Sequence, residues 1–145
     1  MSYYMYRVEG ERGVTIALVK EITRKNGYIG VKMLKIFKDR TPFITFSACL
    51  NFNKPIFVSP ENLIIINPDK TSNLMHISDD NISFITIEDL KDKNLPKIKF
   101  IQCLYDISGT DFPIKLCEAQ GSVSASINNI EALSSQIVEE IKNDI

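Results

Sequence analysis

The residues best suited to acid–base or metal chemistry lie around the single histidine of the chain. His76 precedes Asp79 and Asp80 by a few positions. An imidazole and two carboxylates can hold a divalent cation or pass a proton to a substrate. Asp-Asp-Asn is equally typical of a tight turn, because these side chains bond to their own backbone. An enzyme that uses His76 with Asp79 or Asp80 is therefore the third of three functional hypotheses.

Three cysteines are the other candidates for metal binding or nucleophilic catalysis. Cys49, Cys103 and Cys117 are widely spaced, and no CxxC pair occurs in the sequence. A zinc site that joins them to His76 lacks the paired ligand spacing of such sites, and no neighbouring residue marks a thiol as activated. Their odd number predicts reduced thiols packed in a core, and so a reducing compartment.

Motifs that bind phosphate or activate a serine do not occur in the sequence. There is no G-x-S-x-G, no P-loop and no G-x-G-x-x-G. Residues 121–126 (GSVSAS) are small, but they lack the lysine of a phosphate-binding loop and favour a strand with outward serines. We therefore predict no catalytic residue, no cofactor and no metal, and a protein that is not an enzyme.

Aromatic side chains are dense at the start of the chain, where Tyr3, Tyr4 and Tyr6 stand beside Met1 and Met5. Tyr and Met are enriched at protein interfaces. The segment also fits a first strand, with Tyr4 and Tyr6 on one face and Tyr3 and Met5 on the other. The predicted protein-binding residues are Tyr3, Tyr4 and Tyr6.

Charge is divided unevenly along the chain. Residues 1–40 hold nine Lys and Arg against four Asp and Glu, whereas residues 41–145 hold eight against fourteen. A basic hairpin with nearby aromatic rings can neutralise phosphates and stack on unpaired bases. The sequence pI of about 5.8 argues against a broad affinity for nucleic acid. A local nucleic-acid site is the alternative hypothesis, and its residues are Arg24, Lys25, Tyr28 and Lys32.

Length and composition are typical of one soluble globular domain. The chain has 145 residues, of which 44% are hydrophobic and 24% charged, and a net charge of −1. These values exclude a disordered tail, a collagen-like repeat and a histone-like basic protein. The N-terminus lacks the apolar core of a signal peptide and the longest apolar run is Leu63–Ile66, so we predict a cytoplasmic protein outside the membrane. The polar segment 88–96 is an alternative boundary between two subdomains.

The strongest structural signal is an Asn-Gly pair between two apolar, β-branched segments. Asn26-Gly27 separates residues 13–22 from residues 28–37, and both residues tolerate the positive φ of a type I′ hairpin turn. A two-residue loop also sets the register of its strands. The predicted pairs are Lys25–Tyr28, Ile22–Val31, Glu21–Lys32 and Val19–Leu34. The predicted faces are Ile16, Leu18, Ile22, Val31, Met33 and Phe37 on one side, and Ala17, Val19, Leu34 and Ile36 on the other.

Apolar periodicity predicts further strands and one helix. The strands are expected at residues 43–46, 56–58, 63–66, 74–77, 82–87, 97–105, 112–118 and 122–127. Apolar residues recur at helical spacing from Ile130 to Ile141, which predicts an amphipathic helix over residues 129–143. The sheet of the same chain is the expected cover for its apolar stripe.

Together these patterns predict an α+β fold, with a mainly antiparallel sheet and one C-terminal amphipathic helix packed on it. In one version the sheet curls into a small barrel. The leading functional hypothesis is a small cytoplasmic binding protein, of the adaptor, inhibitor or immunity type, that acts by contact with another protein. A nucleic-acid-binding small barrel is the alternative. The sequence leaves the oligomeric state open, and a homodimer is one alternative, because strand-rich chains with exposed edges often pair.

Overall fold

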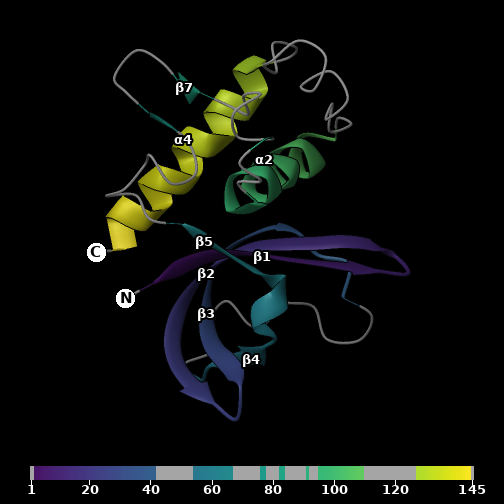
Figure 1. Ribbon diagram of the computed structural model, residues 1–145, viewed down its shortest axis with the longest axis vertical. Coiled ribbons are helices and arrows are strands. Elements are labelled where there is room, and N and C mark those ends of the chain that lie inside the picture. The colour runs from purple at the N-terminus through teal and green to yellow at the C-terminus, as the bar shows by residue number, and fades with distance from the viewer. Residues whose placement is uncertain are drawn as a thin grey trace. The chain divides into compact units, whose positions relative to one another are not determined.

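The chain divides into two compact units, Met1–Ile66 and Asn67–Ile145. The computed structural model describes residues 2–41, 54–66, 76–77, 82–83, 91, 95–109 and 127–144. A β-sheet forms the first unit, and the second contains two helices and a two-stranded ribbon (Figure 1). The predicted α+β class is therefore confirmed, whereas the single-domain organisation stays a prediction.

Five antiparallel strands make up the sheet of the first unit, in the order β4-β3-β2-β1-β5. They are β1 (Tyr3–Gly10), β2 (Gly13–Lys25), β3 (Tyr28–Lys38), β4 (Ile56–Val58) and β5 (Leu63–Ile66). Strands β1, β2 and β3 each pair with the next strand described along the chain, and β5 returns to pair with β1. The predicted antiparallel sheet is confirmed, and the strands predicted at 56–58 and 63–66 are β4 and β5.

The sheet is curled, and its two edge strands are joined by a very short connection. Four residues, including the 3-10 turn Pro60–Asn62, lead from β4 at one edge to β5 at the other. Such a link spans at most about 18 Å, whereas the edges of a flat five-stranded sheet lie about 19 Å apart. Among the strands described, β4 and β5 do not pair with each other, so the sheet is curled but does not close into a barrel.

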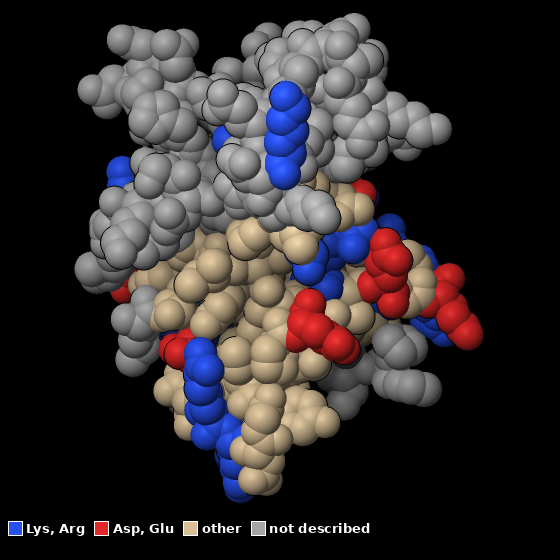
Figure 2. All heavy atoms as spheres, in the orientation of Figure 1, with Lys and Arg blue, Asp and Glu red and all other residues tan. Residues whose placement is uncertain are grey.

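Charged side chains gather at the two hairpin ends of the sheet (Figure 2). One is the end of the β1–β2 hairpin, on the right of the view, and the other is the end of the β2–β3 hairpin, at the bottom. The β2–β3 turn has the predicted geometry, since Asn26 and Gly27 have φ values of 54° and 82°. Lys25 pairs with Tyr28 as predicted.

Away from this turn the predicted pairing of β2 with β3 is wrong, because three residues are inserted as β-bulges. Ile22 is the extra residue of β2, and Leu34 and Phe37 are the extra residues of β3. Each insertion moves the following pairs by one position, and the alternation of faces on which the prediction depended does not hold there. The observed pairs are Glu21–Val31, Lys20–Lys32, Val19–Met33, Leu18–Lys35, Ala17–Ile36 and Ile16–Lys38.

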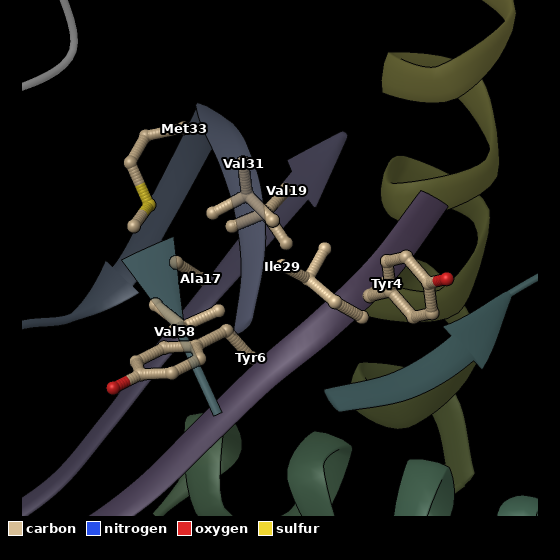
Figure 3. Packing of buried hydrophobic residues seen from close by; sticks show 8 residues of the cluster. All are labelled: Tyr4, Tyr6, Ala17, Val19, Ile29, Val31, Met33 and Val58. Atoms are coloured by element: carbon tan, nitrogen blue, oxygen red, sulfur yellow. The ribbon is translucent and has the colours of Figure 1, made fainter. Parts of the chain in front are cut away.

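The inner face of the curled sheet forms the apolar core of the first unit. Its buried residues are Tyr4, Tyr6, Ala17, Val19, Ile29, Val31, Met33 and Val58. Figure 3 shows these side chains, from four strands, gathered between the ribbons. Val31 shares this face with Val19, whereas the prediction placed it with Leu18. The other side of the sheet is the outer face, on which Met5, Ile16 and Leu18 are also fully buried.

Two helices in contact with each other account for most of the described part of the second unit. Its elements are β6 (His76–Ile77), β7 (Ile82–Ser83), α2 (Leu95–Ser108) and α4 (Ile127–Asp144). The predicted C-terminal helix is confirmed by α4, in which Ile130, Ile137 and Ile141 are buried at helical spacing. The packing of this helix on the sheet stays a prediction.

The strand predicted at residues 97–105 is wrong, because the segment lies in α2. A short apolar run fits both periodicities, and the spacing of three and four residues is the one realised. Pro96 is the second residue of α2, and proline is typical of a first helical turn. This residue was the sequence signal that could have indicated the start of a helix. The buried residues of α2 are Lys97, Phe100, Ile101, Cys103, Leu104 and Tyr105.

Several predicted elements lie outside the described residues. They are the strands at residues 43–46 and 112–118, the turn at residues 79–81, and the strand at residues 122–127 except for Ile127, where the prediction is wrong because this residue begins α4. The strands predicted at 74–77 and 82–87 are described only at His76–Ile77 and Ile82–Ser83, and there they pair as β6 and β7.

Candidate binding surface on the outer face of the hairpin

The end of the β2–β3 hairpin places neighbouring basic residues on opposite faces of the sheet. Residues directly opposite each other in an antiparallel pair share a face, and neighbours along a strand alternate. Ile29 belongs to the inner-face core, so Arg24, which pairs with it, also lies on the inner side. Lys25 and Tyr28 pair with each other on the outer face.

All five lysines of β2 and β3 lie on the outer face, and they are Lys20, Lys25, Lys32, Lys35 and Lys38. In a regular strand Lys35 would point to the opposite face from Lys32. The bulge at Leu34 brings Lys35 back to the outer face, opposite Leu18, and the bulge at Phe37 does the same for Lys38. The bulges that invalidate the predicted register therefore align the positive charges of β3.

Acidic residues do not balance these lysines within their own strands. Glu21 is the single acid of β2, β3 and β4, and it lies on the inner face opposite Val31. Its Oε1 accepts a hydrogen bond from Arg24 Nε at 2.7 Å. This hydrogen bond, together with the charge of Glu21, raises the pKa of the Arg24 guanidinium. Lys25 and Lys32 form no ion pair with any residue that the structure describes.

Apolar groups around Gly30 lie between the two exposed lysines of the hairpin end, Lys25 and Lys32. Gly30 lies between Thr23 on β2 and Phe57 on β4. A Cβ atom at Gly30 would lie 2.7 Å from Thr23 Cγ2 and 3.1 Å from Phe57 Cε1. The threonine methyl group, the phenylalanine ring and Pro55 Cβ, the last also at 3.1 Å, therefore surround the position of this Cβ, where a larger residue does not fit without displacing one of them.

Large apolar side chains near Gly30 are exposed to solvent. Tyr28 is 53% exposed, Phe57 is 45% exposed, and Ile22, displayed by its bulge next to Thr23, is 43% exposed. We name this surface the outer platform, and its members are Thr23, Lys25, Tyr28, Gly30, Lys32 and Phe57. It combines aromatic rings with positive charge and contains no acidic residue.

The outer platform ends toward β1, where the outer face becomes buried. Tyr3 is 6% exposed, and Lys20 Nζ lies 5.6 Å from the centroid of its ring, within cation–π distance. Lys35 Nζ lies at the same distance from the ring of Phe37. The accessible part of the face is therefore the hairpin end rather than its full length.

Three of the four residues predicted for nucleic-acid binding come together on this surface. Lys25, Tyr28 and Lys32 are members of the outer platform, whereas Arg24 lies on the other face, paired with Glu21. Phe57 is not among the residues predicted from the sequence, because its place beside β3 depends on a long-range pairing that local patterns do not encode.

The three tyrosines predicted to bind a protein partner lie in β1 as core residues. Tyr3, Tyr4 and Tyr6 are 6%, 7% and 7% exposed. Burial raises the pKa of the Tyr6 hydroxyl. The predicted strand with alternating faces is confirmed, since Tyr4 and Tyr6 belong to the inner-face core and Tyr3 does not. Binding of a partner through these rings stays a prediction.

The residues considered for metal or acid–base chemistry are described only in part. His76 lies in β6, and Asp79 and Asp80 lie outside the described residues. Cys103 is buried in α2, whereas Cys49 and Cys117 lie outside the described residues. Among the residues that the structure describes, no three His, Cys, Asp or Glu side chains come together in a way that could hold a metal.

An open depression lies between α2 and α4 in the described part of the second unit. Its volume is about 330 Å³, and it is lined by Ile107, Ser108, Ala132, Leu133 and Gln136. The lining has no charged group, so it offers no chemistry beyond weak polar contacts.

Comparison with known proteins does not assign the chain to a class. No protein-family model, no curated protein and no solved structure matches it. Within the described part of the chain, no helix has the length and apolar character needed to cross a membrane. The functional argument therefore depends on the outer platform itself.

Proposed function

We propose that this protein is a non-catalytic binding protein that holds nucleic acid on the outer platform. The observation that carries the proposal is the position of two exposed lysines, Lys25 and Lys32, beside exposed aromatic rings on one face, with Glu21, the single acid of these strands, on the other. A row of lysines binds a polyanion by neutralising phosphates and releasing their counterions. The exposed rings between the lysines offer contacts to bases.

The distribution of charge between the two units supports a local site. Residues 1–66 contain ten Lys and Arg and five Asp and Glu, a net charge of +5, whereas residues 67–145 have a net charge of −6. The overall charge of −1 thus conceals a basic first unit. Charge at the binding face, rather than net charge, sets the local potential that a phosphate chain meets.

The test is binding of fluorescein-labelled 20-residue oligonucleotides, single-stranded and duplex, measured by fluorescence anisotropy between 50 and 200 mM salt. The variant Lys25→Gln/Lys32→Gln removes two charges from the outer platform. The control Arg24→Gln removes a neighbouring, exposed charge from the inner side. We expect the double variant to reduce the slope of log affinity against log salt by about 0.7 per lysine on single strands, and the control to leave affinity unchanged.

Two results would contradict the proposal. One is no change in anisotropy with any of the oligonucleotides at 50 mM salt. The other is an equal loss of affinity in the Arg24→Gln control, which would place the binding surface elsewhere.

Contact with a partner protein is the second candidate function, and the exposed side chain of Ile22 favours it. Protein interfaces have an apolar centre and a polar rim, and the hairpin end exposes the apolar side chains of Ile22 and Phe57 as well as Lys25 and Lys32. The discriminating experiment is affinity capture with and without nuclease. Capture of a partner protein that survives nuclease and is lost in Ile22→Thr would favour protein contact. For either candidate function we also propose a cytoplasmic location, with a homodimer as one possible assembly.

A further inference from the structure

The aromatic rings of the outer platform distinguish between two forms of nucleic acid, provided that the proposed function holds. In a duplex the flat faces of the bases are stacked on each other and only their edges and the phosphates are accessible. In a single strand the bases are free to stack on protein rings, and every base has such a face. Exposed rings therefore favour a single strand, whereas lysines alone serve both forms.

The two exposed rings are close enough to act together. Phe57 is directly opposite Gly30, and Tyr28 lies two residues before Gly30 on β3. They are thus diagonal neighbours on one face, a separation of about 7–8 Å that aromatic side chains bridge. Because Gly30 has no side chain, nothing rises between the two rings, and the Phe57 ring reaches over its backbone.

The exposed lysines flank the rings on the same face. Lys25 is opposite Tyr28 at the turn, and Lys32 lies two residues beyond Gly30 in the other direction. A single strand of nucleic acid that crosses the hairpin end along β3 would meet Lys25, then the two rings and then Lys32. Bases over the rings would then have phosphates within reach of both amino groups.

We propose that the ligand of the outer platform is single-stranded nucleic acid, with unpaired bases stacked on Tyr28 and Phe57 and phosphates held by Lys25 and Lys32. Gly30 is a positioning residue, because it leaves the space in which the Phe57 ring is seated. Stacking of this kind depends on the π-face of the base and not on its edges, so we infer little discrimination between sequences.

The experiment compares a labelled 20-residue oligothymidine with a 20-base-pair duplex, at 100 mM salt, for the intact protein and a set of variants. Phe57→Ala and Tyr28→Ala each remove one ring, and we expect either change to weaken single-strand binding about fivefold to 100-fold, the range for loss of one base–ring stack. Phe57→Tyr keeps a ring and should bind like the parent. The control Ile65→Ala truncates an equally exposed apolar residue, 49% exposed on β5, and should have no effect.

Circular dichroism and urea unfolding of each variant separate loss of binding from loss of structure. Phe57→Leu provides a second check, because it keeps apolar bulk without a ring and should lose affinity while the fold is retained. Duplex binding as tight as single-strand binding, with unchanged affinity in the ring variants, would overturn this inference but leave the proposed function intact. Absence of binding to both probes would overturn both.

Discussion

The aromatic residues of β1 and those of the β2–β3–β4 hairpin end are chemically alike but differ in their surroundings. Tyr4 and Tyr6 are 7% exposed and pack in the inner-face core, whereas Tyr28 and Phe57 are about half exposed on the outer face. Burial of a ring stabilises a fold, whereas a ring that stays exposed contributes little to stability. The comparison indicates that the first pair holds the sheet together and that the second pair is available for binding.

The basic residues at the hairpin end divide in the same way. Arg24 and Lys25 are adjacent in the chain, and both are exposed. Arg24 is held by Glu21 on the inner side, while Lys25 lies beside an exposed ring on the outer side. A charge that already has a partner contributes less to capturing a phosphate than one that does not. The two basic residues therefore differ in the face that they occupy and in their partners.

The largest expected effect comes from truncating one ring of each pair. We expect Tyr6→Ala to lower the free energy of unfolding by about 3–5 kcal/mol, the range for loss of a buried aromatic ring. Phe57→Ala should change it by less than about 0.5 kcal/mol, as is usual for surface positions. Urea denaturation followed by circular dichroism measures both values. Equal costs for the two variants would remove the distinction between core and binding rings.

The fit of the ring over Gly30 is tested by adding one methyl group. Gly30→Ala places a Cβ against Thr23 Cγ2 and the Phe57 ring, so we expect a loss of about 1–3 kcal/mol in unfolding free energy, as in overpacked sites. Thr23→Ala removes the nearest clashing atom, and the double variant Thr23→Ala/Gly30→Ala should recover part of that loss. Additive losses in the double variant would show that Thr23 Cγ2 does not obstruct a Cβ at position 30.

The smallest expected effect concerns the buried hydroxyl of Tyr6, whose pKa is raised above its ordinary value of 10.0 by burial. A raised pKa means that folding favours the protonated form, so this contribution to stability is complete below pH 10 and is lost as the pH rises further. We expect the unfolding free energy of the parent to fall between pH 10 and 11 more steeply than that of Tyr6→Phe. Parallel pH profiles for the two proteins would contradict the burial of this hydroxyl.

Much of the sheet was predictable because its signals are local. The Asn26-Gly27 turn requires positive φ at both residues, and an apolar, alternating sequence on each side of it identifies β2 and β3. The apolar stripe of α4 was predictable for the same reason, since its helical spacing can be recognised within one continuous segment of the sequence. Conversely, the apolar residues of α2 fit both the alternation of a strand and the spacing of a helix. The sequence alone did not distinguish these two structures, and the segment forms a helix.

The candidate site was predictable only in part, because it depends on pairing and on bulges. Lys25, Tyr28 and Lys32 are close in sequence, and their proximity followed from the turn. The bulge at Leu34 moves Lys35 to the outer face, and no local pattern announces such an insertion. Phe57 reaches the site through the pairing of β4 with β3, which joins residues far apart in the chain.

The central claim is that the outer platform, and not the rest of the sheet, contacts nucleic acid. The most direct measurement is a titration of the ¹⁵N-labelled protein with the 20-residue oligothymidine, followed by amide chemical shifts. The account predicts that shift changes concentrate at Thr23, Gly30 and Phe57, while the amides of the β1–β2 turn and of Ile65 remain in place. Unchanged spectra, or changes confined to residues outside the outer platform, would contradict it.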